Sequence, residues 1–520
     1  MSASSGSTAA PATYLPVAIA DGIRASAAAT PGKVALADGQ RELTYRDLVA
    51  RIDRVANGAI VGLGLGRGER AALLAPNCLE YLELVCGLAS AGLATATINA
   101  RSSLREIAMI VGDAGARVLF VHPTLEEAAR DAQLVSVERV IVIGEEYEQW
   151  LGRSRAQPCG LALEEWDPFC IPYTSGTTGE PKGVVLSHRS RVLTFFAMAV
   201  AFGCYSAQDR ALAIAPLYHG AGFAFAAAPV FFGGYCEILP RFDPELALRR
   251  LADAQMTNTF MVPSHFQAIF SLEEAVRTRL RPGHLRSLIS NAAPLAQVTK
   301  ERIVEYFGDG LLHECYGSTE TGITSSIGPA DQLRKEQCVG LPFPCTAVRV
   351  LDEQGAEVGP GEIGEVFSRS PYMFNGYWGK PELTAATMRD GWFSPGDLGR
   401  RDDEGFLYIV DRKDDKIISG GVNIYPREIE EAIVRHPAVR EVAVFGVPDP
   451  YWGEAVHATV VLVPGADAGA EEIVEACADL GRYKLPKHVA FTESLPRNSS
   501  GKLLRRELRA PFWVGRQGGV

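Results

Sequence analysis

The segment Ala71-Ala72-Leu73-Leu74-Ala75-Pro76 is a short apolar run that ends at a proline, and a helical pattern, CLEYLELVCGLASAG at 78–92, follows it. The same alternation returns along the first four hundred residues. Further apolar runs are RVLFVH (117–122), RVIVIG (139–144) and NTFMVP (258–263). Nearly continuous apolar strands that alternate with helices are typical of parallel sheets covered on both faces. The sequence therefore predicts an α/β fold whose large N-terminal part contains layered, mostly parallel sheets.

Two changes of pattern divide the rest of the chain. Between about 362 and 410, short strands and Gly/Asp turns such as DGWFSPGD (390–397) predict a small β-rich subdomain. After Arg412 the pattern becomes α+β: PREIEEAIVRHPAV at 426–439 has apolar residues at helical spacing, and the strand-like EVAVFGV and HATVVLV follow. This tail of about a hundred residues is long enough for a domain of its own.

Composition excludes several classes of protein. A formal net charge of -11 gives no general attraction for nucleic acid or an anionic bilayer. The ten cysteines form no C-x-x-C pair and no zinc-type cluster, so we expect reduced thiols in a cytoplasmic protein. The N-terminus lacks the features of a signal peptide, and we expect residues 1–13 to be a disordered leader. The uncharged run 211–236 is interrupted by Pro216 and Pro229, which favours a buried core and pocket wall over a membrane span.

The strongest motif is YTSGTTGEPKG at 173–183. Small hydroxyl residues and glycines let backbone N–H groups and Oγ donors close around phosphate oxygens, and Lys182 supplies a cation. The predicted phosphate contacts are Thr174, Ser175, Gly176, Thr177, Thr178 and Lys182. Because Gly183 follows Lys182, the string is not a Walker A loop.

This string resembles the signature of the adenylate-forming (AMP-binding) superfamily, which includes acyl-CoA synthetases, peptide-synthetase adenylation domains and luciferases. Five further motifs match in chain order: APLYH (215–219), YGSTETG (316–322), GWFSPGD (391–397), DRKDDKIISGG (411–421) and NSSGK (498–502). The resemblance covers essentially residues 35–510. It implies an AMP-binding N-terminal domain at 14–410, a hinge at 411–415, a mobile catalytic-lid domain at 416–510 and a tail at 511–520.

The resemblance also implies a reaction. A carboxylate is a poor electrophile, so such enzymes let it attack the α-phosphate of ATP, which releases pyrophosphate, and the mixed anhydride then reacts with a thiol. Charge that develops on the phosphoryl oxygens requires fixed cations and donors. The implied substrates and cofactors are a carboxylic acid, ATP, Mg²⁺ and coenzyme A. We expect the protein to be a monomer or a homodimer.

Site residues follow from the same resemblance. Lys502 is the implied catalytic lysine, Thr319 a phosphate donor and Glu320 the magnesium ligand. Tyr316 presents a flat face for adenine, Asp397 an acceptor for the ribose hydroxyls, and Arg412 a donor to ribose or phosphate oxygens. The remaining implied nucleotide contacts are Gly317, Ser318, Asn291, Ala292, Ala293 and Pro294.

Other residues are implied to act in the second half-reaction or to line the pocket that binds the acid. Asp414 matches the hinge residue, and Ser419, Gly420 and Gly421 match the segment that approaches coenzyme A. His219 matches a residue between the acyl pocket and the thiol tunnel, and the apolar run after it suggests Phe223 and Phe225 as pocket lining. An uncharged, Phe-rich wall favours a fatty, aryl or alicyclic acid over acetate.

Two places depart from the family pattern. Pro395 stands where a threonine is usual, which removes a hydroxyl and a backbone N–H beside the predicted ribose site. Asn291 and Ala292 stand where glycines are common, so their side chains could shape the acyl pocket or narrow it.

Three rival functions can be compared with this prediction. Amino-acid activation is disfavoured because LYHGAGFAFAAAP (217–229) contains no acidic residue to pair an ammonium group. An acyl-AMP ligase that loads an acyl carrier protein stays open, although the short junction at 409–412 leaves no room for the usual insertion. A non-catalytic nucleotide- or acyl-binding homologue is disfavoured because Lys502, Glu320, Asp397 and Arg412 are all present. The sequence therefore predicts an ATP-dependent acyl-CoA synthetase.

Overall fold

The computed structural model describes residues 14–175, 181–497 and 503–514. The predicted leader 1–13, the middle of the predicted phosphate loop (Gly176, Thr177 and Thr178) and Lys502 lie outside these residues.

A seven-stranded sheet carries the segment 70–74 at its centre. Its strands run in the order β18 (Gly376–Tyr377), β8 (Pro181–Ser187), β7 (Pro168–Ser175), β4 (Ala94–Ile98), β3 (Arg70–Leu74), β5 (Val118–Val121) and β6 (Arg139–Val142). The pairs among β7, β4, β3, β5 and β6 are parallel, and β8 and β18 add an antiparallel edge. The strands predicted near 71–76, 117–122 and 139–144 are confirmed as β3, β5 and β6.

Helices cover both faces of this sheet, as the nearly continuous apolar strands predict. Ala71 and Leu73 of β3 join the core formed with α3, whereas Ala72 and Leu74 join a second core formed with α4. The helices of this part are α1 (Asp21–Ala29), α2 (Tyr45–Asn57), α3 (Leu79–Ser90), α4 (Leu104–Ala114), α5 (Glu126–Asp131) and α6 (Glu145–Gly152). Alternate residues of one strand thus stabilise two cores.

A nine-stranded sheet forms the second half of the large domain. Its order is β15 (Leu341–Pro342), β14 (Gly322–Ile327), β13 (Leu312–Ser318), β12 (Ser287–Ser290), β11 (Asn258–Met261), β9 (Arg210–Ala213), β10 (Tyr235–Ile238), β1 (Val34–Ala37) and β2 (Glu42–Thr44). The pairs from β13 to β1 are parallel and the edges are antiparallel. Helices α9 (Pro244–Asp253), α10 (Pro263–Phe270), α11 (Glu274–Arg279) and α12 (Gln297–Phe307) belong to this half.

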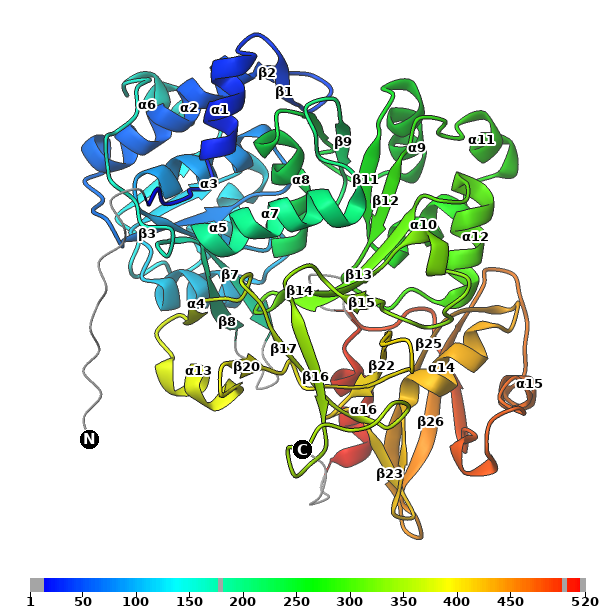
Figure 1. The fold of residues 1–520 in the computed structure, drawn as a ribbon. Helices are drawn as coiled ribbons and strands as arrows, with labels where there is room; N and C mark the ends of the chain where they lie inside the picture. Colours follow the sequence, from blue (N-terminus) through cyan, green and yellow to red (C-terminus); the bar gives the residue numbers. More distant parts are fainter. Residues whose placement is uncertain (1–13, 176–180, 498–502, 515–520) are drawn as a thin grey trace.

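Two helices lie between the two large sheets (Figure 1). They are α7 (His188–Phe202) and α8 (Gly220–Phe231), and α8 packs on β9, β10 and β11. The uncharged run 211–236 therefore folds as strand, helix and strand inside the protein, which confirms the expectation of a buried core. In the described part of the chain, no helix has the length and apolar character needed to cross a membrane.

The β-rich segment after residue 346 is an antiparallel, six-stranded sheet. It contains β19 (Met388–Arg389), β20 (Trp392–Phe393), β17 (Gly364–Arg369), β21 (Asp397–Arg401) and β22 (Leu407–Arg412) in that order, with β16 (Ala347–Leu351) paired to β17. Helix α13 (Pro381–Thr387) precedes β19. The small β-rich subdomain expected from the sequence is thus confirmed.

The last part of the chain is a five-stranded sheet with three helices, drawn in orange and red in Figure 1. The strands are β24 (Val422–Ile424), β23 (Ile417–Ser419), β26 (Gly453–Leu462) and β25 (Val439–Asp449), with β27 (His488–Phe491) beside β26. The helices are α14 (Pro426–Val434), α15 (Ala470–Glu475) and α16 (Arg505–Trp513). Ile429 and Ile433, one turn apart on α14, are both fully buried, as their spacing predicts.

A buried ion pair joins α12 to β13. Lys300 Nζ lies 2.5 Å from Glu314 Oε2, and the two side chains are only 1% and 6% exposed. Lys300 also donates to the carbonyl oxygen of Cys338 at 3.3 Å. A buried carboxylate that loses its cation remains desolvated and uncompensated, so this pair holds the strand that leads to residues 316–320.

We predict that Lys300→Met lowers the free energy of unfolding of the large domain by about 3–5 kcal/mol, because it leaves Glu314 unpaired in the interior. Urea unfolding followed by tryptophan fluorescence measures the effect. The double variant Lys300→Met/Glu314→Leu should recover most of the loss. As a control, Arg249→Met breaks the exposed pair with Glu245 and should cost less than about 1 kcal/mol. Equal losses of unfolding free energy for Lys300→Met and Arg249→Met would contradict the claim that the buried Lys300–Glu314 pair stabilises the large domain.

Candidate active site

The turn between β13 and β14 is the centre of the candidate site. Gly317 precedes it, and a Cβ on this residue would stand 1.9 Å from the carbonyl oxygen of Gly322, so only glycine fits. The backbone N–H of Ser318 donates to Thr321 Oγ1 at 3.0 Å, and the N–H of Thr321 donates to Ser318 Oγ at 3.2 Å. These bonds fix the turn that contains Thr319 and Glu320.

Three predicted nucleotide residues from different strands meet at the base of this hairpin. Tyr316 Oη on β13 donates to Asp397 Oδ2 at 2.5 Å, and Arg412 Nη1 at the end of β22 donates to Asp397 Oδ1 at 2.8 Å. Burial raises the pKa of Tyr316 well above its usual value, and the neighbouring Asp397 carboxylate adds to the effect. Tyr316 therefore remains a phenol that donates to a carboxylate held on its other side by a guanidinium.

The segment that departs from the family pattern lies next to this cluster. Ala292 has φ +75°, a left-handed conformation that favours glycine. Its backbone N–H donates to Asn291 Oδ1, while Asn291 Nδ2 donates to Cys315 Sγ on β13 at 3.1 Å. The asparagine thus holds the segment 291–294 against β13 in a conformation that the usual glycine would adopt without strain.

Glu320 contacts a residue that the sequence analysis did not select. Tyr377 Oη on β18 donates to Glu320 Oε1 at 2.9 Å. Burial raises the pKa of Tyr377 and the Glu320 carboxylate raises it further, so the hydroxyl stays protonated. Lys182 Nζ on β8 lies 5.8 Å from the centroid of the Tyr377 ring. The fold therefore gathers a predicted cation and a predicted metal ligand around one tyrosine.

The phosphate-loop residues that are described lie on the β7–β8 hairpin. Thr174 and Ser175 are the last residues of β7, and Thr174 pairs directly with Lys182 of β8. This register places the described ends of the motif next to Lys182, on strand β8, which also pairs with the edge strand β18.

The predicted acyl-pocket residues lie at and after the start of α8. His219 is the N-cap of this helix, and its Nδ1 accepts from the Ala221 N–H at 3.4 Å. Burial lowers the pKa of His219, so the ring is neutral at physiological pH. Phe223 and Phe225 are 5% and 6% exposed, and the ring of Phe225 stacks on Phe260 with centroids 4.2 Å apart. Both phenylalanines are part of the core between the sheets.

The predicted hinge and coenzyme A segment lie in the C-terminal part. Asp414 is exposed in the turn that follows β22, two residues after Arg412. Ser419 pairs with Val422 across a hairpin whose two central residues, Gly420 and Gly421, have φ +58° and +79°. A Cβ on Gly420 would lie 2.6 Å from Trp452 Cε3, so the hairpin rests against the indole. Both positions favour glycine because both have left-handed backbone conformations, and Gly420 also packs closely against Trp452.

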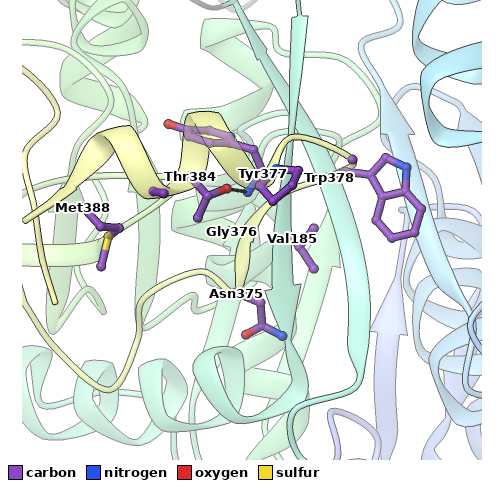
Figure 2. A pocket seen from close by; sticks show the side chains of 10 residues that line it. Val185, Asn375, Gly376, Tyr377, Trp378, Thr384 and Met388 are labelled. Atoms are coloured by element: carbon purple, nitrogen blue, oxygen red, sulfur yellow. Dashed lines mark hydrogen bonds between the residues drawn. The ribbon is translucent and has the colours of Figure 1, made fainter.

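A pocket of about 450 Å³ lies behind Tyr377 (Figure 2). It is lined by Val185, Asn375, Gly376, Tyr377, Trp378, Gly379, Pro381, Thr384, Ala385 and Met388. None of these is a predicted site residue, and their polar groups are few. The Tyr377 backbone N–H donates to Thr384 Oγ1 at 2.9 Å, which fixes the segment from the pocket side. The pocket therefore lies against Tyr377, and its lining includes none of Tyr316, Glu320 and Lys182.

The described residues can accommodate a magnesium ion only as part of a nucleotide complex. They contain no group of three His, Cys, Asp or Glu side chains arranged around a common point. Glu320 offers a single carboxylate, of which Oε1 is bound by Tyr377. Magnesium is commonly held by one or two carboxylates together with substrate phosphates, so one carboxylate beside a phosphate loop fits this ion.

Comparisons with known proteins identify the family of the chain. The family model of the AMP-binding enzyme matches residues 23–378, and the model of its C-terminal domain matches residues 428–502. The chain is 37% identical over 490 residues to a feruloyl-CoA synthase of Amycolatopsis sp, covering 93% of this chain and 96% of that protein. It is 34% identical over 492 residues to an indoleacetate–CoA ligase of Aromatoleum aromaticum, covering 92% and 95%.

Solved structures show the same fold. The crystal structure of ATP-bound MatB from Rhodopseudomonas palustris superposes with a TM-score of 0.86 at 31% identity, over 92% of this chain and 96% of that one. The anthranilate CoA ligase AuaEII in complex with anthranoyl-AMP superposes with a TM-score of 0.89 at 26% identity, over 96% and 98%. With a family model across more than half of its length and full-length relatives above 30% identity, the chain belongs to the AMP-binding enzyme family and is an AMP-forming acid–thiol ligase of the acyl-CoA ligase group.

Proposed function

We propose that the protein activates a hydrophobic monocarboxylic acid with ATP and transfers the acyl group to coenzyme A. The observation that carries the proposal is the uncharged helix α8, which begins at His219 and presents phenylalanines to a core between the two large sheets. An acid with a ring or an alkyl chain gains binding energy from such a wall, whereas acetate has too little apolar surface to do so.

The relatives support this class of acid. Their names include a feruloyl-CoA synthase, an indoleacetate–CoA ligase and a long-chain-fatty-acid–CoA ligase of Bacillus subtilis at 32% identity. Ferulate and indoleacetate are aryl acids and the third substrate is a fatty acid. We therefore take ferulate, indole-3-acetate and decanoate as probes of the substrate class.

In the first half-reaction, the adenine lies on the ring of Tyr316 and the ribose hydroxyls bond to Asp397. Each Asp397 oxygen has a lone pair left beyond the bonds to Tyr316 and Arg412, so the carboxylate can still accept from ribose. A carboxylate oxygen of the acid attacks the α-phosphorus and pyrophosphate leaves. Thr319 and Lys502 stabilise the charge that develops on the phosphoryl oxygens. A magnesium ion at Glu320 supplies neutralisation of the triphosphate charge.

In the second half-reaction, the thiol of coenzyme A attacks the carbonyl carbon of the acyl-AMP and AMP leaves. The hairpin at Ser419, Gly420 and Gly421 approaches the pantetheine arm, and His219 stands between the acyl group and the thiol path. Rotation about Asp414 removes Lys502 and brings in this hairpin. Lys413 and Asp414 are exposed in the turn that follows β22.

A carrier protein is the second candidate acceptor. A fatty acid–[acyl-carrier-protein] ligase, ScoC of Streptomyces coeruleorubidus, is 34% identical over 486 residues. Incubation of preformed acyl-AMP with coenzyme A in one reaction and with phosphopantetheinylated carrier protein in another separates the two. Faster transfer to the carrier protein would refute coenzyme A as the acceptor.

Tyr377→Phe should raise the Mg²⁺ concentration needed for half-maximal adenylation by about tenfold, because Glu320 loses the hydroxyl that orients it. Pyrophosphate release at varied Mg²⁺ measures the change. Tyr306→Phe is the matched control, since its hydroxyl donates to the Arg277 carbonyl oxygen away from the site. An unchanged Mg²⁺ requirement in Tyr377→Phe would contradict the proposal that the Tyr377 hydroxyl orients Glu320 toward the ion.

Lys502→Ala should slow adenylation by about a hundredfold to a thousandfold, because it removes a cation aimed at charge that develops only in that step. Conversion of chemically supplied acyl-AMP to thioester should continue near the normal rate. Single-turnover assays of each half-reaction give the two rates. Equal damage to both would mean that the two steps share one domain arrangement.

Asp414→Pro fixes φ at the predicted hinge and should trap the adenylating arrangement. We expect acyl-AMP to form and persist while thioester formation fails. The same single-turnover assays apply, with Lys413→Ala as a neighbouring control. Normal thioester formation in Asp414→Pro would refute rotation at this residue.

For the acid, we predict a higher kcat/KM for ferulate, indole-3-acetate or decanoate than for acetate or any free amino acid, because only the larger acids bury apolar surface against the α8 wall. Mass spectrometry of adenylates and thioesters, with and without coenzyme A, provides the ranking. A higher kcat/KM for acetate or an amino acid would contradict the proposal that the substrate is a hydrophobic acid.

A further inference from the structure

Arg191, in the first turn of α7, has no counter-ion among the described residues. Its Nε atom is shielded from solvent and makes no described hydrogen bond, and its guanidinium carbon lies 6.0 Å from the centroid of the Phe169 ring. Burial lowers its pKa to about 10, so it remains a cation near neutral pH. Three other cations that are buried or half-buried do have carboxylate partners: Lys300 with Glu314, Arg505 with Glu430 and Arg51 with Glu83.

The groups around Arg191 are neutral. Burial raises the pKa of the Cys170 thiol to about 12, so this neighbour is not a thiolate. Burial, and then Arg191 itself, lower the pKa of His219, so the imidazole is uncharged. Neither residue compensates the guanidinium. Arg191 is half-buried with its Nε shielded from water, and a cation in that position without a counter-ion is retained most simply where an anion binds.

The position of Arg191 indicates which anion. A Cβ placed on Gly220 would stand 3.8 Å from Arg191 Nη2 and 3.9 Å from Thr319 Cγ2, and outside its own helix it would meet no other described atom within 4 Å. Arg191 and Thr319 therefore both lie beside Gly220 at the start of α8. Thr319 lies next to Glu320 in the turn to which the proposed function assigns the α-phosphate, so Arg191 Nη2 lies near the place where the acid would react.

We propose that Arg191 binds the reacting carboxylate of the acid beside Gly220 and Thr319. This inference rests on the proposed function. Adenylation must bring a carboxylate within bonding distance of an α-phosphate, and both groups are anions. A fixed cation on the large domain offsets this repulsion and orients the carboxylate before attack. Arg191 then touches substrate in the first half-reaction only, because acyl-AMP has no free carboxylate.

The test compares Arg191→Leu, Arg191→Lys and the control Arg189→Gln with the unchanged protein. Arg189 is on the same turn of α7 but is already paired with Glu165 at 2.6 Å. Adenylation is followed by pyrophosphate release with ferulate, indole-3-acetate, decanoate and the diacid decanedioate. We expect Arg191→Leu to raise KM for each monoacid by about tenfold to a hundredfold, with KM for ATP changed by less than about twofold. Arg191→Lys should recover part of the loss.

Two further readouts separate this role from a structural one. Conversion of supplied feruloyl-AMP and coenzyme A to thioester should be unchanged in Arg191→Leu. Its melting temperature should stay the same or rise, because an unpaired charge is replaced by an apolar side chain. A lower melting temperature with equal damage to both half-reactions overturns the inference in favour of a structural role.

The other possible results of the KM measurements also test the inference. An unchanged KM for an acid that the protein does adenylate overturns the inference and leaves the proposed function standing. A rise in KM that is confined to decanedioate places Arg191 at the far carboxylate of the acid, and this result also overturns the inference. If the unchanged protein adenylates none of the four acids, both the inference and the hydrophobic-acid proposal fail.

Discussion

The carboxylate of Asp397 is the point on which the arrangement of the site depends. One oxygen accepts from Tyr316 on the nine-stranded sheet, and the other accepts from Arg412 at the end of the six-stranded sheet. Both bonds are short and charge-assisted, and the one from Tyr316 joins the two sheets, because Asp397 and Arg412 are neighbours in the six-stranded sheet. Because Tyr316 begins the hairpin that contains Thr319 and Glu320, the same carboxylate also fixes where the reactive turn lies.

In the proposed mechanism, this constraint separates a rigid part of the chain from a part that moves. Arg412 is anchored, whereas Asp414, two residues later, is exposed in a turn. In the proposed mechanism, the large domain keeps the nucleotide in place while the last hundred residues change position. In this mechanism the large domain contributes Arg191, Thr319, Glu320, Tyr377 and Lys182, which come from a helix, a turn and two strands far apart in sequence. The neutral His219 is the N-cap of α8.

Much of the fold could be predicted because it depends on local patterns. The buried strands at 70–74, 118–121 and 139–142 follow from continuous apolar runs, and α14 follows from the spacing of Ile429 and Ile433. Tyr377 and Arg191 could not be found in this way. Tyr377 reaches Glu320 only because β18 pairs with β8, and Arg191 stands out only once its surroundings prove to be neutral. Its one sequence signal was a charge between buried helix residues, Ser190 and Val192.

The central claim is that the carboxylate of the acid attacks the α-phosphate of ATP and that a thiol then displaces AMP. Turnover of a carboxylic acid labelled with ¹⁸O at both carboxyl oxygens, in the presence of ATP and coenzyme A, tests it directly by mass spectrometry of the products. The account predicts one ¹⁸O in AMP, one in the thioester carbonyl and none in pyrophosphate. Unlabelled AMP, or ¹⁸O found in inorganic phosphate together with ADP, would contradict it.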